Sequence, residues 1–154
     1  MQLHTMAHRL ATDTQVSFAL PRSLDTKIHL RLSIKAKVIV LYLTTVAAED
    51  VGKPVPLGSF VYALPNKYDA HQPLSTTIYH VEATLEFTTR LAKILVRKTG
   101  MPVYVANSIS LVNTGLGGTV EEEMEAFKQV VAVISRELRQ AGLIDQPNGT
   151  LSNS

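Results

Sequence analysis

The sequence contains no cysteine and no tryptophan, and only 6% of its 154 residues are aromatic. Without cysteine the chain has no disulfide framework, no thiolate zinc site and no cysteine nucleophile. Charge is balanced: 15 Lys and Arg against 13 Asp and Glu give a formal net charge of +2, too weak a bias to indicate a polyanionic partner. The longest strictly apolar run, Val38–Leu43, is far shorter than the ~20 residues of a membrane-spanning helix.

Hydrophobic residues make up 45% of the chain, enough for the core of one domain. The N-terminus has no charged start followed by an apolar stretch, so we expect no secretory signal and an intracellular protein. We predict a flexible N-terminal arm over residues 1–14, a single domain over residues 15–142 and a disordered C-terminal tail over residues 143–154.

Six segments have the spacing or composition of β-strands. They are Gln15–Leu20, Lys27–Ile34, Val38–Val46, Leu57–Leu64, Ser75–Val81 and Pro102–Ser108. The first two alternate apolar and polar residues, so one side of each strand is expected to be polar. The third and fourth are apolar at both alternating positions, which predicts burial on both faces.

Two segments have helical spacing. Apolar residues recur through Glu82–Thr99, and Gly100 supplies a stop, although few capping residues precede this helix. Thr119 and Glu122 form a capping box for a second helix that ends at Gly142. The apolar stripe of the second helix comprises Val120, Met124, Phe127, Val131, Ile134, Leu138 and Ala141.

This order of elements predicts an α/β chain of the α+β type. We expect a six-stranded antiparallel sheet with two helices on one face. Two helices cover one face of such a sheet, yet the third and fourth strands are apolar on both. The uncovered face therefore predicts packing against the sheet of a partner chain, and the alternative is that the N-terminal arm folds over it.

Motifs of catalysis and ligand binding are missing from the sequence. No G-x-S-x-G nucleophile motif occurs, and no carboxylates pair as an acid and a base. His4 and His8 have a spacing that suits a metal on a helix, but no acidic third ligand is near. The glycine-rich segment Gly115–Thr119 lacks the residues of a phosphate-binding loop, and three glutamates follow it. We therefore expect no enzyme activity, no cofactor and no metal.

The first predicted helix has a basic side, formed by Arg90, Lys93, Arg97 and Lys98. A solvated helix face or a docking patch for an acidic protein explains it. The alternative function is a small nucleic-acid-binding α+β domain that uses this basic side, although no aromatic residues are interleaved with it.

Several short motifs occur in a characteristic order. They are Gly58-Ser59 with Leu64; Tyr68-Asp69 with Pro73 and Ser75-Thr76-Thr77; Leu91-Ala92, Leu95 and Arg97-Lys98-Thr99; Val103-Tyr104-Val105 and Asn107; and Val120-Glu121 with Glu123-Met124. In their order and spacing, from roughly Val16 to Phe127, the chain resembles the proteasome-assembly chaperone 4 family. The long segment between Val46 and Leu57 and the long arm before Gln15 suggest a fungal-type member.

The resemblance implies a non-enzymatic chaperone with a six-stranded antiparallel sheet and two helices on one side. It implies a heterodimer with proteasome-assembly chaperone 3 that binds an alpha-type subunit of the 20S proteasome, the fifth. This heterodimer promotes assembly of the alpha ring and is released before the mature particle forms. The expected location is the cytoplasm, with the nucleus as a second compartment, and no nucleic acid or membrane is involved.

Two surfaces are expected. The sheet face left bare by the helices, with Val40, Tyr42, Phe60 and Tyr62 as candidates, is predicted to bury against the partner chaperone. The candidate alpha-subunit contacts lie in the loop and on the basic helix, and they are Asn66, Lys67, Tyr68, Asp69, Arg90, Lys93 and Arg97. This second contact is transient, so we expect it to be modest in area and rich in charge.

Overall fold

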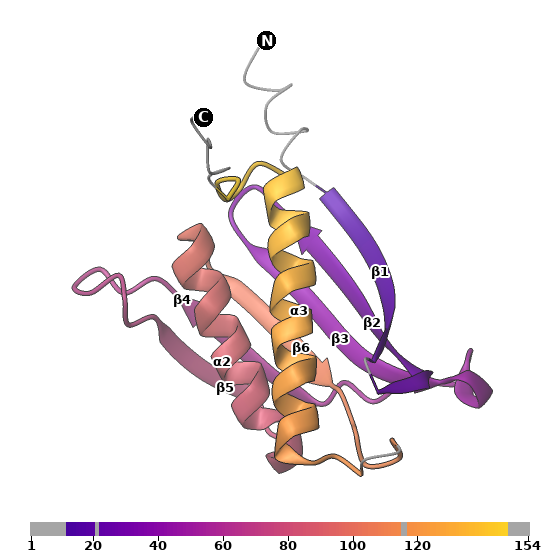
Figure 1. Ribbon diagram of the computed structural model, residues 1–154. Coiled ribbons are helices and arrows are strands. Elements are labelled where there is room, and N and C mark those ends of the chain that lie inside the picture. Colours follow the sequence, from indigo (N-terminus) through magenta and orange to yellow (C-terminus); the bar gives the residue numbers. More distant parts are fainter. Residues whose placement is uncertain (1–11, 21, 115–116, 148–154) are drawn as a thin grey trace, which may run out of the picture.

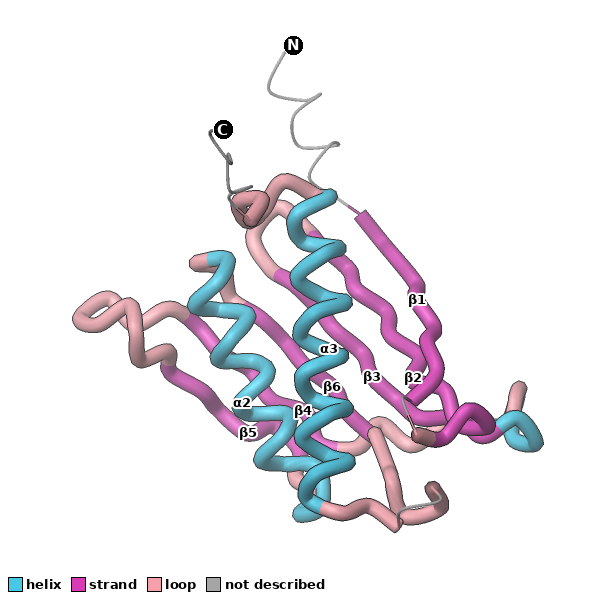
Figure 2. The backbone as a smooth tube through the Cα atoms, viewed as in Figure 1, coloured by secondary structure: helices cyan, strands magenta, loops and turns pink. Residues whose placement is uncertain are grey.

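A computed structural model describes residues 12–20, 22–114 and 117–147. In this part of the chain, six strands form one sheet and two long helices pack on it (Figures 1 and 2). In chain order the elements are β1 (Thr12–Leu20), β2 (Ser23–Ile34), β3 (Ile39–Ala47), the short 3₁₀ turn η1 (Ala48–Asp50), β4 (Ser59–Leu64), β5 (Leu74–Tyr79), α2 (Glu82–Thr99), β6 (Val103–Ser108) and α3 (Val120–Gln140).

The strand order across the sheet is β1-β2-β3-β6-β4-β5. Four of its neighbouring pairs are antiparallel, but β6 runs parallel to β3. The expectation of a wholly antiparallel sheet was therefore wrong at this one pair. The cause is the crossover through α2. This helix connects β5 to β6 and lets β6 enter the sheet between β3 and β4, in the same direction as β3. A connection between strands that run in the same direction needs a helix or a similarly long segment.

Both helices lie on one face of the sheet, as predicted (Figure 2). Side chains at alternate positions of the central strands point into the layer between sheet and helices and are fully buried. On β2 and β3 these are Ile28, Leu30, Leu32, Ile34, Ile39, Leu41 and Leu43, and on β4 and β6 they are Val61, Ala63, Val103 and Val105. The opposite face of the sheet, which we call the open face, is covered by neither helix.

The ends of the helices follow the sequence signals. Gly100 ends α2 in the left-handed conformation (φ 68°), and its amide donates to the Val96 carbonyl at 2.8 Å. The Thr119 hydroxyl accepts a hydrogen bond from the Glu122 amide at 3.2 Å. The Glu122 carboxylate reaches back as predicted, but it accepts from the amide of Gly118 at 3.0 Å, one residue before the Thr119 cap.

The predicted apolar stripe of α3 was wrong in its first half. Val120 is 74% exposed and Met124 is 52% exposed, whereas Ala126 and Val130 are fully buried against the sheet. The reason is that Val120 and Met124 line a hollow between α3 and α2 and do not face the strands.

The boundaries of the domain also differ from the prediction. Strand β1 begins at Thr12, inside the predicted arm, because Thr12 and Asp13 continue the ladder opposite Ile34 and Ser33. At the other end Leu143 and Ile144 pack partly buried against the core, although we placed them in the tail. The rest of the arm, the end of the tail from residue 148 and residues 115–116 of the glycine-rich segment lie outside the described residues.

The Gly58-Ser59 pair joins β4 to the start of α2. Gly58 adopts φ +71°, and a Cβ atom there would lie 1.9 Å from the backbone oxygen of Asn107. The buried Ser59 hydroxyl accepts from the Val81 amide at 3.0 Å and lies 2.8 Å from the Thr84 hydroxyl. Since Val81 has no capping side chain of its own, Ser59 supplies from another strand the polar partner that the sequence before α2 lacks.

Candidate functional site

The four residues predicted to meet a partner chaperone lie together on the open face. Val40 and Tyr42 come from β3, and Phe60 and Tyr62 come from β4, at the positions that alternate with the buried core residues. Tyr42 is 43% exposed, and the other three are half-buried. The structure thus brings these side chains onto one surface, although no contact shown here tests their role in binding.

A fifth residue, Tyr104 of β6, joins this group, and the sequence reasoning did not assign it a role. Its ring centroid lies 4.5 Å from that of Tyr62 and 5.7 Å from that of Phe60. Tyr104 pairs with Val40 on one side and with Tyr62 on the other. Its alternation with Val103 and Val105 was visible in the sequence, but the insertion of β6 between β3 and β4 was not. The result is a continuous aromatic patch, which comprises Val40, Tyr42, Phe60, Tyr62 and Tyr104.

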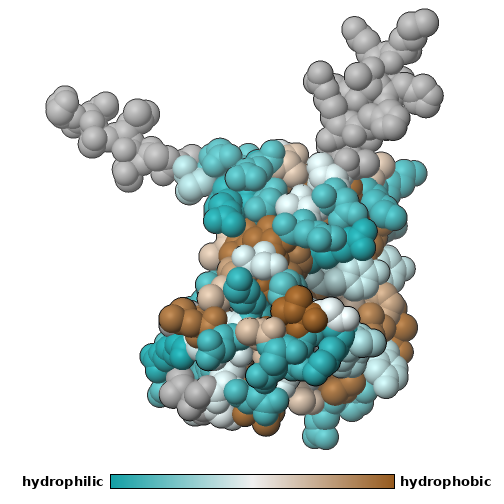
Figure 3. Space-filling view, turned by 90° about the vertical axis from the view of Figure 1, so that its right-hand side faces the viewer, coloured by the Kyte–Doolittle hydropathy of each residue, from teal (hydrophilic) through white to brown (hydrophobic). Residues whose placement is uncertain are grey.

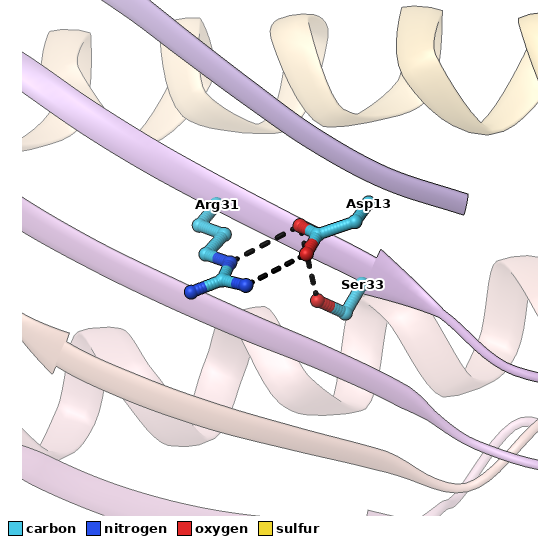
Figure 4. Close-up of polar contacts among 3 residues, drawn as sticks. All are labelled: Asp13, Arg31 and Ser33. Carbon is cyan, nitrogen blue, oxygen red and sulfur yellow. Dashed lines mark hydrogen bonds and ion pairs between the residues drawn. The ribbon is translucent and has the colours of Figure 1, made fainter. Parts of the chain in front are cut away.

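The part of the open face over β1 and β2 is polar. The Arg31 guanidinium donates through Nε and Nη2 to the two carboxylate oxygens of Asp13, at 3.1 and 2.7 Å, and Ser33 donates to the same carboxylate at 3.4 Å (Figure 4). Figure 4 shows these side chains on one side of the sheet and the helices on the other. The hydrogen bond from Arg31 holds the pKa of the Asp13 carboxyl below its ordinary value of 3.8.

Strand β1 forms one edge of the sheet. Seen from this edge, hydrophilic side chains cover most of the surface, and hydrophobic side chains lie among them in separate groups (Figure 3). At the other edge β5 leaves Leu74, Ile78 and Tyr79 more than half exposed. The two edges of the sheet therefore differ in character, and the more apolar edge adjoins the aromatic patch through β4.

The candidate loop between β4 and β5 is held by its own side chains. Asn66 accepts from the amide of Tyr68 at 3.0 Å, and Asp69 accepts from the amide of His71 at 2.9 Å. Such contacts between a side chain and the backbone two residues on are typical of Asx turns. The loop projects beyond the sheet with Lys67 exposed and Tyr68 fully exposed (Figure 1). It presents an aromatic side chain to solvent on a backbone that these turns hold.

The basic residues of α2 lie on one stripe of that helix, since Arg90, Lys93 and Arg97 are three and four residues apart. The Arg90 guanidinium lies 4.8 Å from the centre of the Phe127 ring of α3, so this end of the stripe faces α3. The β4–β5 loop lies on the opposite side of α2 (Figure 1). The structure therefore divides the predicted alpha-subunit contacts into two groups.

The sequence reasoning missed the hollow beside Arg90. Its volume is about 300 Å³, and the exposed Val120 and Met124 of α3 line it together with Glu86 of α2. The sequence did not indicate this surface, because the predicted apolar stripe of α3 includes Val120 and Met124 among its buried residues. The helix side of the molecule thus offers an apolar groove with charged residues of both signs at its rim.

The described residues include no cluster of three or more His, Asp or Glu side chains that could hold a metal ion. In the same part of the chain, no helix has the length and apolar character to cross a membrane. The described surface includes the aromatic patch, the polar part of the open face, the projecting loop and the groove between the helices.

Comparison with known proteins gives a family and a fold. A search of curated proteins gives no match. The structure is similar to a chain in the crystal structure of a novel chaperone complex for yeast 20S proteasome assembly, with a TM-score of 0.63 and 13% sequence identity over 84% of this chain and 98% of that chain. The model of the family "Proteasome assembly chaperone 4" matches residues 27–109, from β2 to just past β6. Because this match covers more than half of the chain, the protein belongs to the proteasome assembly chaperone 4 family.

Proposed function

We propose that this chain is a non-enzymatic chaperone for the 20S proteasome alpha ring that works as a heterodimer with proteasome assembly chaperone 3. The open face is the surface that this partner covers. The observation that carries the proposal is the aromatic patch: five side chains on three adjacent strands, on the face of the sheet that neither helix covers (Figure 2). An apolar patch of this kind is typical of a protein interface.

Packing of two sheets face to face suits this surface. Sheets in a sandwich lie about 10 Å apart, and their inner side chains interdigitate. A partner sheet on the open face would remove the aromatic patch from water, while the helices of this chain stay on the outside. The arrangement leaves the groove between α2 and α3 and the β4–β5 loop free for a second protein.

The second protein is an alpha-type proteasome subunit, the fifth, held by the loop with Tyr68 or by the basic stripe of α2. Both are exposed and carry charged or polar groups, as a transient contact requires. The chaperone then leaves before the mature particle forms, in the cytoplasm and the nucleus. This contact is expected to weaken at about 0.5 M salt, where charges are screened within a few ångströms. Binding that is unchanged by such salt would contradict a charged contact.

Native mass spectrometry of the co-expressed pair tests the proposal. The chain is produced with its cognate assembly chaperone 3, and each protein is also produced alone. We expect a one-to-one complex, and we expect the lone chain to be self-associated because its aromatic patch is uncovered. A soluble monomer that does not bind the partner would overturn the proposal.

A further inference from the structure

The open face has a hollow of about 280 Å³ where its aromatic and polar parts meet. The polar wall includes Ser17, His29 and Arg31 from β1 and β2. Tyr42 of β3 and the segment 55–57, which follows η1, supply the apolar wall. The hollow therefore lies on the surface that we propose for the partner chaperone, and any sheet packed there would cover it.

Hydrogen-bond donors dominate the polar wall. Arg31 is cationic, Ser17 and Tyr42 carry hydroxyl groups, and the His29 ring bonds to Ser17 at 2.8 Å. No Asp or Glu is among the described residues that line the hollow. Because Asp13 already balances the charge of Arg31, a group that enters the hollow meets the unused guanidinium donors and the hydroxyl groups. A carboxylate is the acceptor that binds guanidinium donors most strongly.

Arg31 has one edge of its guanidinium already bound and one edge free. A guanidinium carries five N–H donors in a planar fork and can bind a carboxylate along either of two edges. Asp13 takes the edge formed by Nε and Nη2. In Figure 4 the remaining nitrogen points away from Asp13, and among the described residues Arg31 makes side-chain hydrogen bonds to Asp13 alone.

If a partner covers the open face, burying the unused donors of Arg31 costs free energy. In the isolated chain both Arg31 and Asp13 are about half exposed, and water satisfies the unused donors. A second sheet would remove that water, and a buried charged donor without an acceptor is strongly unfavourable. A stable complex therefore requires an acceptor from the partner at this point.

We propose that this hollow is a socket for one acidic side chain, Asp or Glu, from the sheet of the partner chaperone. The acid inserts between Arg31 and Tyr42 and binds the free guanidinium edge. This inference rests on the proposed function, because it names the chemistry by which the same open face selects its partner. The aromatic patch supplies apolar contact area, and the socket fixes which partner fits and in which register.

The test measures the dissociation constant of this chain with its cognate assembly chaperone 3 for three proteins: the wild type, Arg31→Gln and Arg136→Gln. Arg136→Gln is the matched control, because it removes one exposed positive charge from α3. We expect Arg31→Gln to bind at least about tenfold more weakly and Arg136→Gln to bind like the wild type. Thermal unfolding of each free variant checks that the fold is retained.

A charge exchange identifies the acid. Arg31→Glu is combined in turn with a Lys at each Asp and Glu of the partner, and we expect one combination to restore binding. Wild-type affinity of Arg31→Gln, or no restoring combination, would overturn the socket while leaving the heterodimer intact. Failure of the wild-type pair to associate would overturn both proposals. A homodimer that Arg31→Gln dissociates would show that the acid comes from a second copy, which overturns the assignment to the partner.

Discussion

Arg31 and Tyr42 are direct partners across the antiparallel ladder between β2 and β3, and both side chains lie on the open face. They mark the line where the polar part of that face meets the aromatic patch. A substitution at either residue therefore acts on the surface with little effect on the core, which lies on the other side of the sheet.

Tyr42→Asp is expected to leave the fold intact and to abolish the heterodimer. Tyr42 is 43% exposed, and Arg31 beside it offers a carboxylate a cationic neighbour in the free chain. In the complex the same carboxylate would be buried among apolar groups and would occupy Arg31. Native mass spectrometry measures the complex, and Tyr42→Phe is the control that keeps the ring. A Tyr42→Asp protein that still co-purifies stoichiometrically would remove Tyr42 from the interface.

The Asp13–Arg31 pair gives stability a dependence on acid pH. The pKa of the Asp13 carboxyl is lowered in the folded chain, mainly by its hydrogen bond from Arg31, so its contribution is full above the ordinary value of 3.8 and is lost as the pH falls through the lower, folded value. Melting temperatures of the wild type and Asp13→Asn should differ near neutral pH and converge in strong acid. A difference that stays constant through this range would show that the ion pair does not stabilise the fold.

Gly58→Ala is expected to be among the most destabilising single substitutions of a glycine in this chain. The added Cβ meets the Asn107 backbone at 1.9 Å, and φ is +71°, so β4 and β6 have to separate locally. We expect a loss of about 3 kcal/mol or more, against about 1 kcal/mol for Gly52→Ala, where φ is +88° but the space is open. Urea unfolding of both variants measures this, and equal losses would show that backbone strain, and not the close approach, sets the cost.

Ser59→Ala tests the hydroxyl contacts that join β4 to α2. The substitution leaves the part-buried Val81 amide without its acceptor, while the Thr84 hydroxyl keeps its contacts with the residue 59 amide and the Val81 carbonyl, so we expect a cost of about 1–3 kcal/mol. Ser75→Ala on the exposed strand β5 is the control, and its effect should stay within about 0.5 kcal/mol. Chemical denaturation gives both values, and a neutral Ser59→Ala would mean that water replaces the hydroxyl.

Local patterns predicted the elements of the fold but not their neighbours. The bounds of α2 were predicted correctly, because Gly100 ends it and its apolar residues keep one spacing. The pairing of β6 with β3 was not predictable, since it depends on contacts between distant segments that no short pattern encodes. The orientation of β3 and β4 was open for a different reason: a strand that is apolar at both alternating positions does not show which side faces the helices.

For the candidate site, too, the local positions were predictable and the spatial neighbours were not. Val40, Tyr42, Phe60 and Tyr62 lie on one face as the prediction required, while their role in binding stays a prediction. The candidate alpha-subunit residues were chosen from exposed-looking stretches of sequence, and such stretches carry no information about which of them adjoin in space. The exposed Val120 and Met124 illustrate a further limit, because an apolar residue on the correct helical stripe still escapes burial where the stripe faces a groove.

The central place of β6 shapes how this chain acquires its structure during synthesis. Strands β3 and β4 have no hydrogen bonds to each other, and β6 bonds to both. A growing chain that has emerged only as far as α2 holds a three-stranded unit, β1-β2-β3, and a hairpin, β4-β5, without a common sheet. Strand β6 then forms hydrogen bonds with both units. Ile39 of β3 can pair with Val103 of β6 only after the intervening strands and helix have been made. Completion of the open face is therefore a late event, and the full aromatic patch forms only after β6 has joined the sheet.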